Sequence, residues 1–406
     1  MMTTCVAAEA TDLKISDISS GTNGIVVSWQ SRIGGQYRVD HAVGLTGAWS
    51  KGQSLAALTN FMLFVDHESA FSTSRFYRLA IERVPVERVR HWAYVIQDLD
   101  APERREELVG THYDMYVLEP TVTERGNESF DIAGLVRDIR NHVISNYHKN
   151  PLILAYVDIG QAEDWRWYWQ AGWAVGNPDW IVGSDPDGWT GCYTVAYWRP
   201  EWHDIVIFGT NGRSHIEETL KAGFDGVYMD WLDAFSDPAV VAKAATENTN
   251  TAAAMFDFVE KIRTYARETS SNANHDYMIV AQNAADLYQE NPSRYEQLID
   301  AIAVEGIWYD GDDGFDDWNH PRGYNVPTDE IYPGWTAEVL SYLEPMKGRL
   351  PIFCCEYAQD INGTNLASMV YTNLAVQNGF IPYCTRRSLQ RLSKTPYPVN
   401  YFPFDY

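Results

Sequence analysis

The sequence predicts a (β/α)8 barrel of the TIM type, preceded by a small all-β domain that resembles a sandwich. Three observations carry this prediction. From Arg90 onward, short apolar runs alternate with amphipathic stretches, which is the pattern of parallel strands joined by helices. Eight such runs occur between Arg90 and the end of the 406-residue chain, a length that suits a barrel with long loops. Residues 11–83 instead show closely spaced, alternating runs.

The N-terminal segment, residues 11–83, has the pattern of a small antiparallel domain. Its expected strands are separated by Gly and Asn turns, and they cover residues 25–29, 37–39, 62–65 and 75–79. Trp29 and Tyr37 are its expected core aromatics. The pattern resembles the fibronectin-type-III-like modules of secreted hydrolases. We place a linker at residues 84–86 and the barrel domain at residues 90–406.

The barrel segment carries eight expected strands and six expected helices. The strands are residues 92–99, 114–118, 152–158, 226–231, 277–283, 301–306, 351–357 and 380–384. The helices are residues 132–145, 215–222, 251–269, 293–298, 336–343 and 366–377. An open doubly wound sheet is the alternative fold. It is disfavoured because Gln-Asp-Leu-Asp, and no glycine-rich turn, follows the first strand.

Composition excludes several classes of partner. The net charge of −24 repels phosphate, so no nucleic acid partner is expected, whereas a neutral or cationic substrate suits this charge. No apolar run is long enough to predict a membrane span. The five cysteines stand at irregular spacing, and no cofactor or metal motif is apparent. We expect a monomer.

Two segments leave alternatives open. The acidic stretch 310–317 could be a solvated loop, a partial mimic of a calcium loop, or a surface that faces a cationic substrate. Residues 1–10 are too short for a signal peptide, yet Ala8-Glu9-Ala10 has the form of a cleavage site. Either the chain is cytoplasmic, or its start falls inside a longer export signal; we expect a secreted or cell-surface protein.

Polar residues, most of them acidic, end the expected strands. They are Asp98, Asp100, Glu119, Asp158, Asp230, Asp233, Gln282, Asn283, Glu305 and Glu356. The carboxyl ends of barrel strands form the mouth at which such enzymes carry their chemistry. Carboxylates brought together raise one another's pKa, which prepares them to act as acids or nucleophiles. No His, Ser or Cys ends a strand in the context of a nucleophile elbow or a catalytic triad, so the pattern predicts glycoside hydrolysis.

Five motifs, in order along the chain, resemble glycoside hydrolase family 114. They are AYVDIGQAEDWRWYW at residues 155–169, YWRPEW at 197–202, GFDGVYMDWLDA at 223–234, AQN at 281–283 and VEG at 304–306. The family consists of enzymes similar to endo-α-1,4-polygalactosaminidases. The resemblance implies an endo-acting enzyme on an α-linked, cationic, galactosamine-rich exopolysaccharide.

The same resemblance assigns the catalytic pair. Asp230 becomes the nucleophile or charge stabiliser and Glu305 the general acid/base, with retention of anomeric configuration implied by the likeness to α-galactosidase barrels. The expected substrate-binding residues are Asp98, Asp158, Glu163, Arg166, Trp169, Tyr197, Trp198, Asp233, Gln282, Asn283, Trp308 and Glu356.

Structural explanations compete with these roles. Asp230 could cap a helix, Glu305 could pair with a buried arginine, and Glu163 with Arg166 could form an ion pair that orders the loop after the third strand. The chain also departs from the family pattern: Gln161 stands where Glu is common. The alternative functions are a glycosidase of the same fold that acts on a neutral α-glycan and a catalytically silent glycan-binding barrel.

Overall fold

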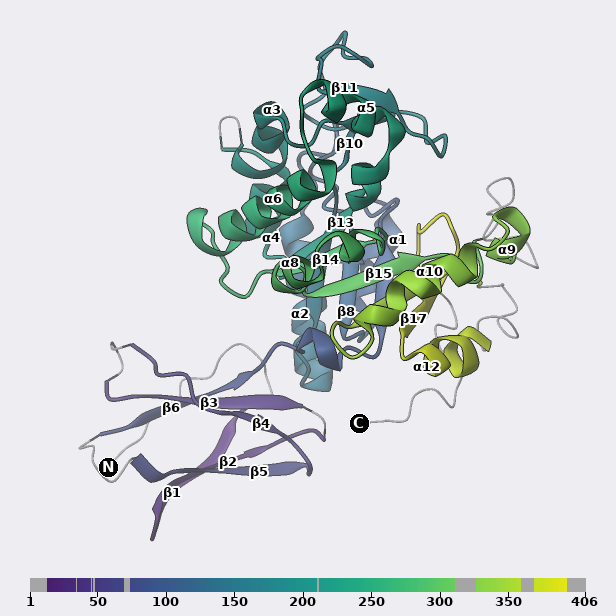
Figure 1. The fold of residues 1–406 in the computed structure, drawn as a ribbon. Coiled ribbons are helices and arrows are strands. Elements are labelled where there is room, and N and C mark those ends of the chain that lie inside the picture. Colours follow the sequence, from purple (N-terminus) through teal and green to yellow (C-terminus); the bar gives the residue numbers. More distant parts are fainter. Residues whose placement is uncertain are drawn as a thin grey trace.

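A computed structural model describes residues 13–33, 35–44, 46, 48–68, 74–209, 212–310, 326–358 and 369–392. Figure 1 shows two parts. A small all-β domain lies beside the larger barrel, whose strands are surrounded by helices. The predicted fold class is therefore confirmed.

The N-terminal domain consists of two antiparallel three-stranded sheets, β1-β2-β5 and β4-β3-β6. Its strands are β1 (Ile15–Gly21), β2 (Gly24–Gln30), β3 (Gln36–Ala42), β4 (Ser54–Ala56), β5 (Phe61–Asp66) and β6 (Phe76–Ile81). Trp29 and Tyr37 are fully buried in its core, with ring centroids 5.8 Å apart. Both predicted core aromatics are confirmed, whereas β1 and β4 were not anticipated because their residues are largely exposed and carry little apolar pattern.

Eight parallel strands form the barrel, in the order β17-β16-β15-β14-β13-β9-β8-β7. They are β7 (Trp92–Val95), β8 (Met115–Leu118), β9 (Leu152–Asp158), β13 (Gly226–Asp230), β14 (Met278–Gln282), β15 (Ala301–Glu305), β16 (Ile352–Glu356) and β17 (Ile381–Cys384). Each matches a predicted strand. The spatial order follows the chain order without a switch point, which excludes the doubly wound alternative. Trp92 Nε1 donates to the Ile381 carbonyl at 3.1 Å and links the first strand to the last.

Helices surround the strands. They are α1 (Pro102–Val109), α2 (Ile132–Tyr147), α3 (Pro200–His203), α4 (His215–Ala222), α5 (Pro238–Thr246), α6 (Thr251–Thr264), α7 (Leu287–Glu290), α8 (Pro292–Leu298), α9 (Thr328–Ile331), α10 (Trp335–Leu343) and α12 (Ala375–Asn378). Helical turns η3 (Asp204–Phe208), η4 (Leu232–Ser236), η5 (Tyr265–Thr269) and η8 (Val370–Leu374) extend this layer. The bounds of α4 match the prediction because Ser214 caps its first turn and Gly223 ends it in the left-handed region.

A small sheet interrupts the barrel after β9. It contains β10 (Gln161–Glu163), β11 (Ile181–Ser184) and β12 (Cys192–Val195), in the order β10-β12-β11. The sequence predicted only a long loop here, because strands this short carry too few residues to show alternation.

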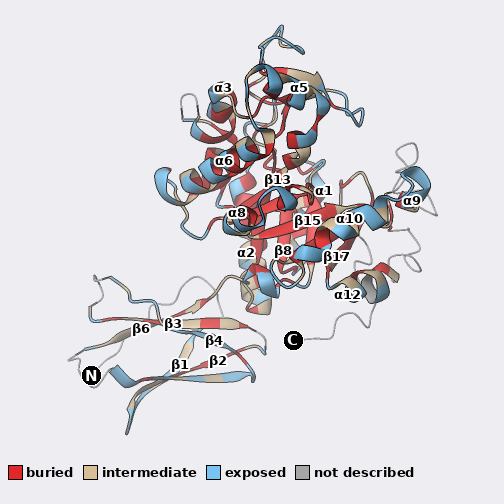
Figure 2. Ribbon diagram, viewed as in Figure 1, coloured by how far each residue is buried: buried red, intermediate tan, exposed pale blue. Residues whose placement is uncertain are grey.

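Aromatic rings fill the barrel interior. Tyr94 on β7 contacts Tyr228 on β13, with centroids 5.1 Å apart, and Trp92 contacts Phe353 on β16 at 5.5 Å. These strands are not neighbours in the sheet, so the rings meet across the interior of the barrel. Figure 2 shows the barrel strands as the most continuously buried part of the molecule. Since side chains alternate along a strand, these rings identify the residues that face inward.

The two domains make direct polar contacts. The Tyr37 hydroxyl lies 2.9 Å from His148 Nδ1, and Arg83 pairs with Asp225 at 2.9 Å. The main-chain N–H of Val84 donates to the Asn150 carbonyl at 2.8 Å. His148 and Asn150 precede β9 and Asp225 precedes β13, so the N-terminal domain contacts the end of the barrel opposite the mouth.

Candidate active site

Asp230 and Glu305 end β13 and β15, which flank β14 in the barrel. Tyr228 faces inward, so Asp230, two residues later on the same strand, also faces inward. The two carboxylates are close enough that the charge of Asp230 raises the pKa of Glu305. The fold therefore brings both predicted catalytic residues to the mouth.

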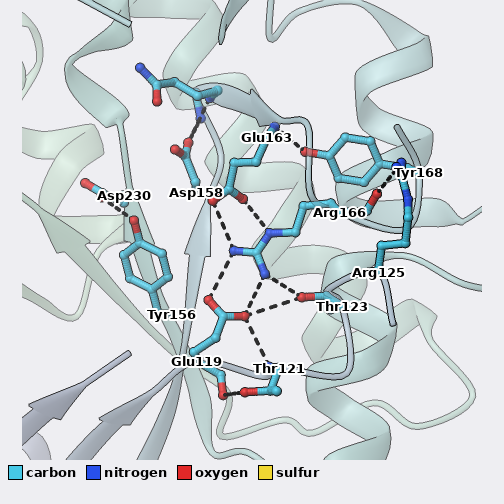
Figure 3. A network of polar contacts seen from close by, with 12 residues as sticks. Glu119, Thr121, Thr123, Arg125, Tyr156, Asp158, Glu163, Arg166, Tyr168 and Asp230 are labelled. Atoms are coloured by element: carbon cyan, nitrogen blue, oxygen red, sulfur yellow. Dashed lines mark hydrogen bonds and ion pairs between the residues drawn. The ribbon is translucent and has the colours of Figure 1, made fainter. Parts of the chain in front are cut away.

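Asp230 is held by two donors. The Tyr156 hydroxyl donates to Oδ2 at 2.6 Å, as Figure 3 shows, and the main-chain N–H of Trp231 donates to Oδ1 at 2.8 Å. Burial raises the pKa of Asp230, while these two hydrogen bonds oppose that effect and favour the ionised form. Trp231, and not Asp230, occupies the position before η4, so the helix-cap explanation does not describe this carboxylate.

Glu305 has a different environment. The Tyr357 hydroxyl donates to Oε1 at 2.7 Å, and the Glu305 main-chain N–H donates to Asn283 Oδ1 at 3.1 Å. Burial, with the nearby charge of Asp230, raises the pKa of Glu305 to about 7. Among the described residues, a tyrosine and not an arginine contacts this carboxylate directly. A carboxyl group with this pKa exchanges protons near neutral pH, as a general acid/base must.

Asp158 and Asp233 lie beside the pair. Asp158 ends β9 and accepts hydrogen bonds from the main-chain N–H groups of Gly160 at 3.0 Å and Gln161 at 2.8 Å. Burial and the nearby charges of Glu163 and Asp230 raise the pKa of Asp158 well above its usual range. Burial, with the charge of Asp230, also raises the pKa of Asp233, to about 8.

Arg166 belongs to a buried network and does not reach the mouth surface. Figure 3 shows its guanidinium between two carboxylates: Nε donates to Glu163 at 2.6 Å, and Nη1 donates to Glu119 at 2.7 Å and to Thr123 at 2.8 Å. Nη2 contacts both carboxylates, so every N–H group of Arg166 has a protein partner. The ion pair considered as an alternative is present, and we correct the expectation that Glu163 and Arg166 touch sugar.

Three further predicted substrate contacts lie inside the protein. Tyr197 is fully buried and donates to the Thr251 carbonyl at 2.8 Å. Gln282 is fully buried beneath the pair, and its side chain lowers the pKa of Glu305. These positions exclude direct sugar contact in this structure, so we correct that expectation for both residues.

Glu356 is the third of these buried residues, and its expected sugar contact is corrected too. Phe353 faces the barrel interior, so Glu356, three residues later, faces the opposite side of the sheet. Its fully buried carboxylate accepts hydrogen bonds from the main-chain N–H groups of Ile307, Trp308 and Tyr309. Glu356 therefore shapes the loop after β15 and does not face substrate.

Apart from Asp158, which is buried beside the pair, the remaining predicted contacts are at least partly accessible. Asp98 is exposed on the turn after β7, and Asn283, Trp169, Trp198 and Trp308 are half-buried. Trp169 stacks on Tyr193 with centroids 4.9 Å apart, and Trp198 Nε1 donates to Glu247 at 2.7 Å. Their contact with substrate stays a prediction.

Sequence reasoning missed four residues at the mouth: Tyr156, Tyr357, Asp185 and Asp187. The spacing of Tyr156 two residues before Asp158 was a usable signal, because both must face inward on one strand. Tyr357 comes two residues after Cys355, and the same alternation predicts that both side chains face inward. Asp185 and Asp187 lie on the turn between β11 and β12, whose path no local pattern predicted.

The residues that the structure describes contain neither a candidate metal-binding group nor a helix that could span a membrane. They contain no group of three or more His, Cys, Asp or Glu side chains arranged to hold a metal ion. They contain no helix that is long and apolar enough to cross a membrane. The acidic stretch 310–317 lies outside the described residues except for Asp310, which pairs with Arg387 at 2.9 Å.

Inward-facing carboxylates at the mouth of an eight-stranded parallel barrel fit the class of barrel glycosidases. Residues 107–399 match glycoside hydrolase family GH114, which covers well over half of the chain. The chain belongs to that family.

Similar proteins are found in several organisms. The chain is 30% identical over 305 residues to an uncharacterized protein of Thermotoga maritima, which covers 74% of this chain and 81% of the relative. It is 30% identical over 223 residues to an uncharacterized protein of Methanocaldococcus jannaschii, covering 54% of this chain and 57%, less than two thirds, of the relative. Among solved structures, it is similar to Aspergillus fumigatus Ega3 in complex with galactosamine, with a TM-score of 0.45, 15% identity, and coverage of 77% of this chain and 96% of Ega3.

Proposed function

We propose that this glycosidase cleaves an α-linked, galactosamine-rich polysaccharide at internal bonds. The observation that supports the catalytic assignment most strongly is the pair of tyrosine-held carboxylates on β13 and β15. Burial raises the pKa of Asp230, and two hydrogen bonds oppose this effect and favour its ionised form, whereas Glu305 has a pKa near 7 and can hold a proton at neutral pH. Two carboxylates with separate roles are what glycoside hydrolysis requires.

The proposed reaction has two steps. In the first, Asp230 attacks the anomeric carbon while Glu305 gives its proton to the departing glycosidic oxygen, so that one C–O bond forms as another breaks. In the second, Glu305 takes a proton from water, whose oxygen attacks the same carbon and releases Asp230. Two inversions give net retention. Tyr156 and Tyr357 position the carboxylates throughout.

Charge supports a cationic substrate. The chain carries a net charge of −24, and Asp230, whose two hydrogen bonds favour its ionised form, lies at the mouth. A field of this sign concentrates cations, and the amino groups of deacetylated galactosamine are protonated at neutral pH. A neutral α-glycan is the alternative substrate, and a glycan-binding barrel without activity is the alternative function.

The test is depolymerisation of defined polymers. We expect the protein to release reducing ends from deacetylated polygalactosamine, with products of intermediate length at early times, as internal cleavage gives. Asp230→Asn should release reducing ends at least ~100-fold more slowly, whereas Asp17→Asn, an exposed charge change on β1, should match the wild type. If the protein cleaved only neutral α-glycans, the substrate would be a neutral α-glycan and the proposed substrate would be wrong. If the protein bound glycan tightly but released no reducing ends, the result would favour a glycan-binding barrel without activity.

We also propose a secreted or cell-surface monomer with domains at residues 11–83 and 90–406. The family's polymeric substrates, as the sequence resemblance implies them, are too large to enter a cell, which supports this location. Fractionation of native cells and light scattering of the purified chain test the location and the oligomeric state.

A further inference from the structure

The sheet inserted after β9 carries an acidic turn that the proposed reaction does not use. We define the acidic turn as residues 185–189, Asp-Pro-Asp-Gly-Trp, between β11 and β12. Asp185 is 8% exposed, whereas the Trp189 side chain is 56% exposed. An exposed indole ring therefore lies in the same turn as a largely buried carboxylate, and an exposed aromatic ring can pack on a ligand.

Two donors fix the Asp185 carboxylate. Gln161 Nε2 donates to Oδ2 at 2.7 Å, and the main-chain N–H of Trp189 donates to Oδ1 at 2.9 Å. A carboxylate offers about four lone-pair positions, so both oxygens keep acceptor capacity. The bond from Trp189 also fixes its main chain relative to the carboxylate.

Gln161 connects the acidic turn to the catalytic carboxylates and leaves an acceptor unused. Its main-chain N–H donates to Asp158, which pairs in register with Asp230. Gln161 is 1% exposed, and within the described residues its Oε1 atom has no hydrogen-bond partner. Since Nε2 of the same amide contacts Asp185, this unpaired oxygen lies next to that carboxylate. The amide thereby holds Asp185 in a fixed position relative to the strand ends that carry Asp158 and Asp230.

Gln161 places the acidic turn beside the mouth, because its amide donates to Asp185 and its main-chain N–H donates to Asp158. Charge interactions agree with this position. The carboxylates of Asp185 and Asp187 both act on Asp230, and Asp187 also acts on Asp233. Asp187 interacts in addition with Arg387 and Asp310, which follow β17 and β15. The turn thus lies near the ends of several barrel strands.

We propose that Asp185, Asp187 and Trp189 form a specificity subsite that binds the ammonium group of an amino sugar adjacent to the cleavage point. This inference rests on the proposed function. An ammonium group has three N–H donors and a positive charge, which suit two carboxylates, and an indole ring can pack on the C–H face of the same sugar. An N-acetyl group lacks the charge and would leave Asp185 without a cationic partner.

Binding without turnover tests the subsite. Calorimetry on the Glu305→Gln protein compares oligosaccharides of galactosamine and of N-acetylgalactosamine. Adding Asp185→Asn should weaken binding of the galactosamine oligosaccharide by at least ~10-fold, the scale of a lost charged hydrogen bond, and change binding of the acetylated one less than ~2-fold. Adding Trp189→Ala should weaken both. Asp17→Asn, which removes the same charge far away on β1, should weaken neither.

The outcomes separate the inference from the proposed function. Equal affinities with and without Asp185→Asn, or equal loss for both oligosaccharides, would overturn the subsite and leave the proposed substrate standing. Failure of the Glu305→Gln protein to bind either oligosaccharide would overturn the subsite together with the proposed substrate class. If Asp185→Asn does not fold by circular dichroism, Asp187→Asn on the exposed part of the turn takes its place, with the same expected selectivity.

Discussion

The Tyr357 hydroxyl donates a hydrogen bond to Glu305 Oε1 at 2.7 Å, and this contact lowers the pKa of Glu305 against the opposing effect of burial. A phenol that donates to a carboxylate stabilises the ionised form. The balance leaves the Glu305 pKa at about 7, so the residue can give a proton in one step and accept one in the next.

Tyr357→Phe should move the pH dependence of kcat/KM. Removal of the donor raises the pKa of Glu305, and a general acid must be protonated, so activity should persist to higher pH than in the wild type. A pH profile of kcat/KM checks this. Tyr265→Phe, which removes a similar hydroxyl from Glu217 outside the mouth, is the control and should leave the profile unchanged. If the high-pH limb of the kcat/KM profile of Tyr357→Phe did not move, or moved to lower pH, the role of Tyr357 would be contradicted.

Stability should fall as pH rises from about 6.5 to about 8. Glu305 and Asp233 have folded-state pKa values of about 7 and about 8, above their unfolded values, so the native state binds more protons in this range. Groups with lowered pKa, such as Asp114 and His203, act at lower pH. Urea unfolding at both pH values measures the effect. Asp233→Asn should reduce the slope, and a stability that rises over this range would show that these acids are not buried as described.

Arg166→Met should destabilise the protein strongly. Glu119 and Glu163 would remain buried without their partner, and breaking a buried ion pair in this way costs about 3–5 kcal/mol. Arg105→Ala is the matched control, because its pair with Asp138 is on the surface and should contribute about 0–1 kcal/mol. Urea unfolding compares the two variants. Equal losses would mean that the Arg166 network does not order the loop after β9.

Deletion of residues 1–85 should lower stability but leave the barrel active on soluble substrate. The deletion removes Tyr37 and Arg83, which contact His148 and Asp225 at the end of the barrel away from the mouth. The melting temperature should therefore fall while kcat/KM stays within ~2-fold, because domain contacts remote from a site act mainly on stability. A folded truncation without activity would show that the N-terminal domain contributes to the site.

The sequence predicted the barrel well because its strands are buried on both faces and form continuous apolar runs. Strand ends located Asp230 and Glu305, yet they did not distinguish faces: Glu356 also ends a strand, and it points away from the interior. Tyr197 resembled a sugar contact by motif, whereas its burial depends on contacts with Thr251 that are distant in the sequence. The position of the acidic turn could not be predicted from the sequence for the same reason. Asp185 is held by Gln161 across a small sheet that has no local sequence pattern.

The central claim is that Asp230 and Glu305 are the catalytic pair, and turnover of two nearly isosteric variants tests it most directly. Asp230→Asn and Glu305→Gln should each lower kcat on deacetylated polygalactosamine by at least ~100-fold, the usual scale for loss of an essential acid or nucleophile. Both variants should fold, as circular dichroism will check. If either folded variant kept turnover within a few-fold of the wild type, the pair would not be catalytic, and the chemistry would have to be sought in Asp158 or Asp233.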